Sequence, residues 1–164
     1  MGYDCPETYG DPAVLLPDLY FPNVTKKYKI GVVPHYCNLD EATSFFPSDG
    51  SVNIIDVRTE DVEFIIQELL KCEIILSSSL HGLILGHAYS IPSAQVEFTT
   101  SLGGDGVKFL DYFSAFGITP PNPIVIQKNP DVSTLLDYVK HYPQPNSQSL
   151  RSGLYKTCPF IKRN

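Results

Sequence analysis

A run of six residues near the middle of the chain combines three hydroxyl groups with a histidine. The residues are Ser77, Ser78, Ser79, Leu80, His81 and Gly82, and they join an apolar segment to a segment of helical character. Ligands of open α/β sheets bind where strands end and helices begin, because free backbone N–H groups and the helix dipole attract anions there. His81 can bind a phosphate or carboxylate, or transfer a proton near neutral pH. We therefore predict an anion-binding site here; the alternative is that the serines merely cap the helix.

Two further polar residues follow predicted strands. His35 comes directly after an apolar segment, so the same edge of the sheet is expected to bring it toward His81. Asp56 lies near the end of a second apolar segment, where it can accept a sugar hydroxyl or pair with Arg58. His87 lies six positions after His81, about 240° around an α-helix, and is expected to face elsewhere.

The sequence lacks the motifs of several enzyme classes. It contains no G-x-S-x-G elbow, H-E-x-x-H helix, P-loop or G-x-G-x-x-G, which argues against a serine hydrolase, a zinc protease and an NTPase. Its four cysteines are far apart and form no zinc-finger spacing, so we expect them to be reduced and mostly buried. They are Cys5, Cys37, Cys72 and Cys158. We predict neither a metal site nor a cofactor.

Short apolar runs alternate with segments of helical periodicity along the chain. The runs predict strands at 29–34, 52–57, 73–77, 93–98 and 124–126, and the periodic segments predict helices at 62–70, 80–89, 109–116 and 132–139. Thr59 is a plausible cap for the first of these helices. The alternation predicts one α/β domain, residues 1–164, with an open, Rossmann-like parallel sheet and helices on both faces. Residues 1–28 lead into this sheet, and residues 143–164 form a tail that is weakly helical around Leu150 and Leu154.

Composition narrows the class of partner. The 164 residues include 12 Lys plus Arg and 18 Asp plus Glu, a formal net charge of −6, and 43% are hydrophobic. Such a chain can bury a core, whereas its sequence pI near 5.1 argues against binding nucleic acid or an anionic membrane surface. No apolar run approaches a membrane span and the first residues do not form a signal peptide, so we expect a cytoplasmic protein without a transmembrane segment.

Four segments resemble the polysaccharide pyruvyl transferase family. They are Ser-Ser-Ser-Leu-His-Gly-Leu-Ile at 77–84, Tyr-Gly-Asp-Pro-Ala at 9–13, Ile-Gly-Val-Val-Pro-His-Tyr at 30–36 and Lys-Phe-Leu-Asp-Tyr-Phe at 108–113. The family transfers a pyruvyl group from phosphoenolpyruvate to a sugar and forms a ketal. The resemblance therefore implies a transferase of polysaccharide or exopolysaccharide biosynthesis.

The resemblance also implies roles for individual residues. His81 corresponds to the family histidine implicated in binding phosphoenolpyruvate or in proton transfer, and His35 matches a second recurring histidine, so both are the predicted catalytic residues. Many members carry arginine where this chain has Ser79, so one charge that would pair with an anion is missing, although backbone N–H groups compensate in part. Ser77, Ser78, Ser79, Leu80, Gly82 and Asp56 are the predicted substrate-binding residues.

The family has a two-domain, GT-B-like architecture, and this chain looks like its C-terminal domain. The resemblance implies phosphoenolpyruvate, a sugar or lipid-linked oligosaccharide acceptor, and an N-terminal domain or partner chain as partners. Because the family's site lies between domains, the isolated chain is expected to turn over slowly or not at all.

Two other readings remain open on the sequence. One is the domain of a GT-B-type glycosyltransferase, which would hold a nucleotide-sugar diphosphate at the same sheet edge. The other is a non-catalytic module of a truncated or split protein that binds a partner chain or a sugar.

Overall fold

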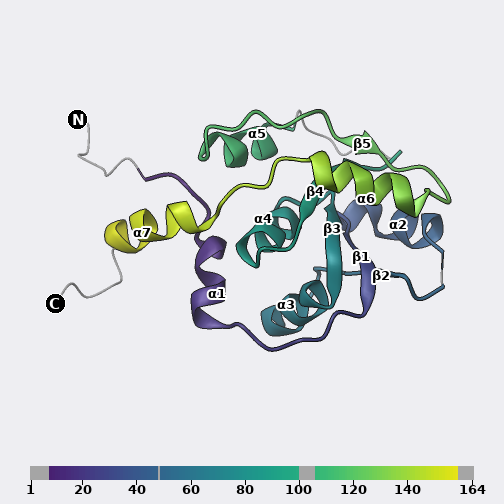
Figure 1. The fold of residues 1–164 in the computed structure, drawn as a ribbon, viewed down its shortest axis with the longest axis horizontal. Coiled ribbons are helices and arrows are strands. Elements are labelled where there is room, and N and C mark those ends of the chain that lie inside the picture. The colour runs from purple at the N-terminus through teal and green to yellow at the C-terminus, as the bar shows by residue number, and fades with distance from the viewer. Residues whose placement is uncertain (1–7, 48, 100–105, 159–164) are drawn as a thin grey trace.

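Five parallel strands form the centre of the computed structural model, which describes residues 8–47, 49–99 and 106–158. Their order across the sheet is β2-β1-β3-β4-β5 (Figure 1). The strands are β1 (Tyr28–Val33), β2 (Val52–Ile54), β3 (Cys72–Ser77), β4 (Ser93–Glu97) and β5 (Ile124–Val125). The predicted Rossmann-like α/β sheet is confirmed, and β2 is three residues shorter than the expected 52–57.

The central pair of strands is apolar because both of its faces are covered. β1 and β3 pair in parallel from Tyr28 opposite Cys72 to Val33 opposite Ser77. Ile74 and Leu76 face one buried cluster, whereas Ile75 faces the other. A strand with helices on both faces gains stability from continuous β-branched and aliphatic residues, as this one has.

Helices lie on both faces of the sheet. α3 (Val62–Leu70) and α4 (Leu80–Ala88) cover one face, and α2 (Leu39–Phe45) and α6 (Val132–His141) cover the other (Figure 1). α5 (Val107–Ser114) packs on the outer side of α4. α7 (Gln148–Thr157) lies beside a short helical entry made of the 3-10 turn η1 (Pro12–Leu15) and α1 (Leu16–Leu19). None of the described helices is long and apolar enough to cross a membrane.

Side chains set where α3 and α6 begin. The Asp61 carboxylate accepts the Phe64 N–H at 2.9 Å, and Asp131 accepts the N–H groups of Ser133 and Thr134. Such N-caps satisfy backbone donors that the helix cannot satisfy itself. The predicted cap Thr59 is therefore wrong: its hydroxyl accepts the Asp61 N–H at 3.1 Å instead, one turn before the helix.

The helical pattern of the sequence does not predict α2. This helix has seven residues, and of these only Ala42 is fully buried, so its apolar stripe is too short to recognise. The weak helical character around Leu150 and Leu154 does correspond to a helix, α7. Both leucines pack against the buried cluster next to η1.

The cysteines of the described residues are free. Cys37 is exposed, Cys72 is buried and Cys158 is half-buried, whereas Cys5 lies outside the described residues. Burial raises the pKa of the Cys72 thiol to about 12. This thiol stays protonated at neutral pH and serves packing, because only a thiolate is a strong nucleophile.

α4 is buried on nearly all sides. Every residue from Gly82 to Ala88 is buried. A Cβ at Gly82 would lie 2.5 Å from the Ser77 Oγ and the Val33 Cγ1, and one at Gly86 would lie 2.0 Å from the Ser93 Oγ. The two glycines therefore let the helix backbone contact the sheet directly.

His87 faces away from His81, in agreement with the helical spacing. It is 4% exposed, and its Nδ1 lies 3.0 Å from the hydroxyl of Tyr112 on α5. Burial lowers the pKa of His87 to about 4. A charged imidazole would be poorly solvated here, so the folded state holds His87 neutral at pH 7.

Truncating the centre of β3 should destabilise the fold. Ile75 is fully buried, so Ile75→Ala is expected to lower the free energy of unfolding by roughly 2–5 kcal/mol, measured by urea denaturation. Leu19→Ala is the control, because Leu19 is 78% exposed and should change stability by less than about 0.5 kcal/mol. Equal midpoints for the two variants would show that β3 is not central.

Buried His87 should make stability depend on pH. The unfolded chain takes up a proton as pH falls through about 6.5, whereas the folded chain does so only near 4. The free energy of unfolding is therefore expected to fall by about 2 kcal/mol between pH 7 and pH 5 on account of this group. In His87→Gln that part of the pH dependence should vanish, and in His141→Gln, which alters an exposed histidine, it should persist. A slope that His87→Gln leaves unchanged contradicts this assignment.

Candidate functional site

Hydrogen bonds of two serines join the ends of β1 and β3. The Ser77 Oγ lies 3.0 Å from the carbonyl oxygen of Val33, and the Ser78 N–H donates to the same oxygen at 3.1 Å. The Ser78 Oγ accepts the His35 N–H at 2.9 Å. Both serines are buried. Their hydroxyls therefore hold the loops after β1 and β3 together, and the ligand contact proposed for them stays a prediction.

The first turn of α4 has no side-chain cap. Ser79 occupies the N-cap position but makes no side-chain capping bond, and Leu80 follows it half-buried. The first backbone N–H groups of a helix have no partner within the helix. The N–H groups of residues 80–82 and the positive end of the dipole therefore lie at the carboxyl edge of the sheet, and His81 on this turn is exposed.

His81 lies on this turn and is largely exposed. Its side chain is 72% exposed, and its Nε2 lies 3.8 Å from the Asp11 Oδ2. Asp11 is itself fixed, because its other carboxylate oxygen accepts the Ala13 N–H at 2.8 Å and so caps η1. The imidazole is thus free to meet a ligand while a carboxylate stands beside it.

His35 is brought to the same edge by the Ser78 hydrogen bond. It is half-buried, its Nδ1 lies 3.4 Å from the Cys37 N–H, and its ring lies against that of Tyr36. Burial and, to a lesser extent, the positive charge of Lys108 lower the pKa of His35. At neutral pH His35 is therefore an uncharged hydrogen-bonding group next to a permanent cation.

A cavity of about 670 Å³ lies beside these residues. Asp11 and Leu80 line it from one side, and Lys108 and Asp111 line it from α5. The cavity therefore borders Leu80 at the start of α4, Asp11 beside His81, and Lys108, whose charge acts on His35. Its size falls within the range of roughly 300–1,000 Å³ that is typical of small-molecule sites.

Asp56 is engaged with Arg58. The guanidinium donates to both carboxylate oxygens, with Nε–Oδ1 at 3.0 Å and Nη2–Oδ2 at 2.8 Å, and the pair is exposed. The hydrogen bonds from Arg58 hold the Asp56 pKa below its usual value. Of the two roles that the sequence left open, the structure shows the ion pair; the contact with a sugar stays a prediction.

Asp11 and Lys108 were not among the predicted site residues. A local signal existed for each. Asp11 precedes Pro12, a common start of a helical turn, and Lys108 lies two residues after Gly106, a glycine with φ of 74° at the start of α5. Their meeting at the edge of α4 depends on the packing of distant segments. Within the described ranges, no group of three His, Cys, Asp or Glu side chains is placed to hold a metal ion.

The chain is similar to two longer proteins. Over 117 residues it is 37% identical to the uncharacterized protein L143 of Acanthamoeba polyphaga mimivirus, a match that covers 68% of this chain and 40% of that protein. Over 113 residues it is 32% identical to the succinoglycan biosynthesis protein ExoV of Rhizobium meliloti, covering 66% of this chain and 34% of ExoV.

This chain spans well under half the length of either relative. No protein-family model matches it, and no solved structure matches it.

Removing the Ser78 hydroxyl should loosen the loop that carries His35. Ser78→Ala leaves the His35 N–H without its acceptor, and we expect a loss of about 1–3 kcal/mol in the free energy of unfolding by urea denaturation. Ser44→Ala is the matched control, because that exposed hydroxyl bonds only to a carbonyl of its own helix. A cost no greater than that of the control would refute the structural role of Ser78.

Proposed function

We propose that this chain carries the donor-binding part of a polysaccharide pyruvyl transferase, which transfers a pyruvyl group from phosphoenolpyruvate to a sugar. The observation that best supports this proposal is the first turn of α4, which lacks a side-chain cap and carries His81. Lys108 lies across the adjacent cavity. The N–H groups of α4, His81 and the positive charge of Lys108 thus lie at one edge of the sheet, where the carboxylates of Asp11 and Asp111 also line the cavity. This arrangement suits a small anion with two acidic groups.

Phosphoenolpyruvate has the charges that such a site needs. Its phosphate would bind the N–H groups at the start of α4, where the dipole favours negative charge. Its carboxylate would lie toward Lys108, since a lysine binds an anion as a point charge. Lys108 and the N–H groups would together replace part of the charge that the family places at the position of Ser79.

The reaction needs a proton at the methylene carbon of the donor. His81, exposed next to the Asp11 carboxylate, would give this proton as general acid and make the neighbouring C2 electrophilic. One sugar hydroxyl would then add to C2 and lose its proton. The C2–O bond to phosphate would break, and a second hydroxyl of the same sugar would add in its place and give its proton to the departing phosphate, while the proton of the first hydroxyl returns to His81. The products are a cyclic pyruvate ketal and inorganic phosphate, so no redox step is required.

The similarity to ExoV supports a glycan as the acceptor, because the name of that protein refers to succinoglycan biosynthesis. We propose a sugar unit of an exopolysaccharide or of its lipid-linked precursor. Phosphoenolpyruvate is a metabolite of the cytoplasm, which makes the cytoplasm the expected compartment. We further propose that a second domain or chain completes the cleft, since the chain spans only about a third of ExoV.

His81→Ala should weaken phosphoenolpyruvate binding without unfolding the protein. Loss of one charge-assisted contact is worth about 1.5–3 kcal/mol, so calorimetry should show a Kd raised roughly 10- to 100-fold. The matched control is His141→Ala. That side chain is 76% exposed and lies 3.7 Å from Asp137, much as the His81 side chain is 72% exposed and 3.8 Å from Asp11. The control should bind as the unaltered chain does.

Two outcomes would overturn the proposal. Equal binding by His81→Ala and His141→Ala would remove His81 from the site. Stabilisation by a nucleoside diphosphate but not by phosphoenolpyruvate, seen as a rise in Tm, would favour a glycosyltransferase domain instead.

A further inference from the structure

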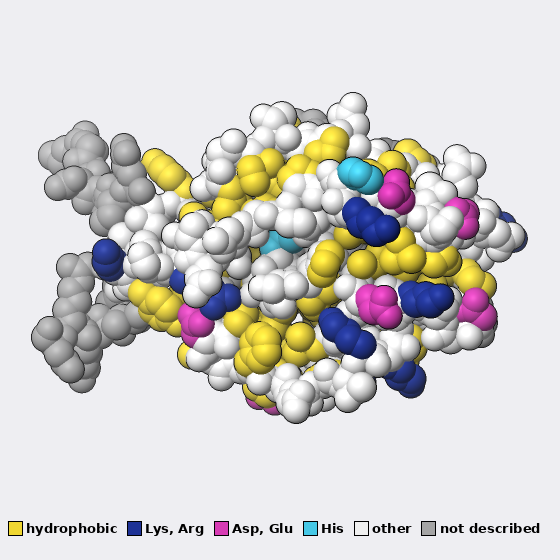
Figure 2. All heavy atoms as spheres, in the orientation of Figure 1, with side chains coloured by type: hydrophobic (Ala, Val, Ile, Leu, Met, Phe, Trp, Pro, Cys, Tyr) yellow, Lys and Arg dark blue, Asp and Glu magenta, His cyan; other side chains and the backbone are white. Residues whose placement is uncertain are grey.

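A second cavity opens at the other end of α4. Its volume is about 430 Å³, and it lies between the end of that helix, the turn into β4 and the start of α7. Figure 2 shows a histidine lying deep in a hollow in the middle of this face, among uncharged side chains. The candidate donor site lies at the start of α4, so the two cavities are separate.

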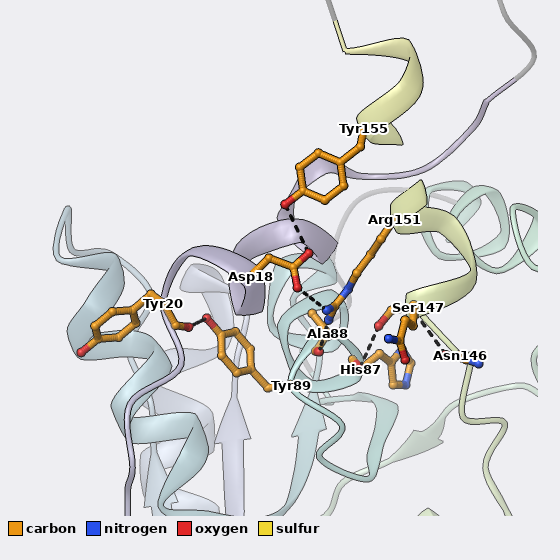
Figure 3. A network of polar contacts seen from close by, with 10 residues as sticks. Asp18, Tyr20, His87, Ala88, Tyr89, Asn146, Ser147, Arg151 and Tyr155 are labelled. Carbon is orange, nitrogen blue, oxygen red and sulfur yellow. Dashed lines mark hydrogen bonds and ion pairs between the residues drawn. The ribbon is translucent and has the colours of Figure 1, made fainter. Parts of the chain in front are cut away.

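The one charged side chain among the described residues lining this cavity is neutralised. The Arg151 Nη1 donates to the Asp18 carboxylate at 2.8 Å, and its Nη2 donates to the carbonyl oxygen of Ala88 at 3.0 Å (Figure 3). The Tyr155 hydroxyl adds a further bond to Asp18 at 3.2 Å. An anion would gain little from an arginine already paired in this way, so the lining favours an uncharged ligand.

Two buried nitrogen atoms at this cavity lack partners. Within the described residues, neither the Nε2 of His87 nor the Nε of Arg151 has a hydrogen-bond partner. Both residues line the cavity. The Nδ1 of His87 already meets the Tyr112 hydroxyl, so its Nε2 needs a donor or an acceptor according to the tautomer. Both atoms lie beneath the wall of the cavity, so the polar groups that a ligand can reach are the exposed side chains at its mouth.

An aromatic ring stands at the rim. Phe21 is 64% exposed and stacks on Tyr89, with the ring centroids 5.7 Å apart. The Tyr89 hydroxyl donates to the carbonyl oxygen of Tyr20 at 2.7 Å, which fixes the Tyr89 ring (Figure 3). Phe21 therefore offers a supported flat apolar surface beside the exposed amides of Asn146 and Gln148.

We propose that this cavity binds a neutral sugar unit of a glycan. A pyranose has an apolar C–H face that packs on an aromatic ring, and a rim of hydroxyls that both donate and accept hydrogen bonds. Phe21 would hold the ring face, and the exposed polar side chains of Ser90, Asn146 and Gln148 would meet the hydroxyls. The choice of a sugar, rather than another neutral polyol, rests on the function proposed above.

Sugar binding can be measured on the full chain without phosphoenolpyruvate. The probes are methyl β-glucoside, methyl β-galactoside and methyl α-mannoside, observed by saturation-transfer NMR. We expect transfer to at least one of them, and at least a fivefold loss in Phe21→Ala. Phe64→Ala removes another exposed ring, on α3 and 50% exposed, and should leave the signal unchanged. Gln148→Trp, which narrows the mouth from an exposed position, should reduce the signal as Phe21→Ala does.

Either of two results would overturn this inference. One is the absence of transfer to all three glycosides, and the other is a signal that Phe21→Ala and Gln148→Trp both leave intact. Neither result bears on phosphoenolpyruvate, so the sugar site and the donor site succeed or fail separately.

Discussion

The carbonyl oxygen of Val33 is the point on which the arrangement of the candidate site depends. It accepts the Ser78 N–H and lies within hydrogen-bond distance of the Ser77 hydroxyl, just where the two central strands end. In the same place Gly82 lets α4 contact the sheet without an intervening side chain. The loop with His35 and the helix with His81 therefore leave the sheet in fixed directions. A larger residue at Gly82 or a lost hydroxyl would disturb both histidines together.

Because of this constraint, the hydroxyls of Ser77 and Ser78 serve the fold. The buried hydroxyls of Ser77 and Ser78 satisfy the backbone of the loops, as buried polar groups must. What is left for a ligand is the backbone of the first helical turn and the side chains around it. Lys108 supplies a permanent charge, and neutral His35 supplies a hydrogen bond. The site is thus built from a helix end and two loops, and α5 adds Lys108 and Asp111.

The sequence predicts the parts of this fold that repeat with a period. β3 and α3 follow from their apolar patterns, and the end of β3 correctly locates the loop that contacts His35. Periodic patterns do not predict a helix start that a single hydrogen bond sets. Asp61, for example, caps α3 in place of Thr59. Such patterns fail also for α2, which is too short to show a stripe. The meeting of Asp11 with His81 spans 70 positions, and no local pattern reports a contact of that range.

The close packing of α4 has a mechanical consequence. Gly82 and Gly86 bring the helix backbone against side chains that leave no room for even a methyl group, so the helix cannot slide along its axis without a clash. Its nine residues span about 13 Å, and a hollow opens beside each end. The helix therefore acts as a rigid spacer that fixes the distance between the two hollows. An extended molecule that occupied both hollows would have to match this distance.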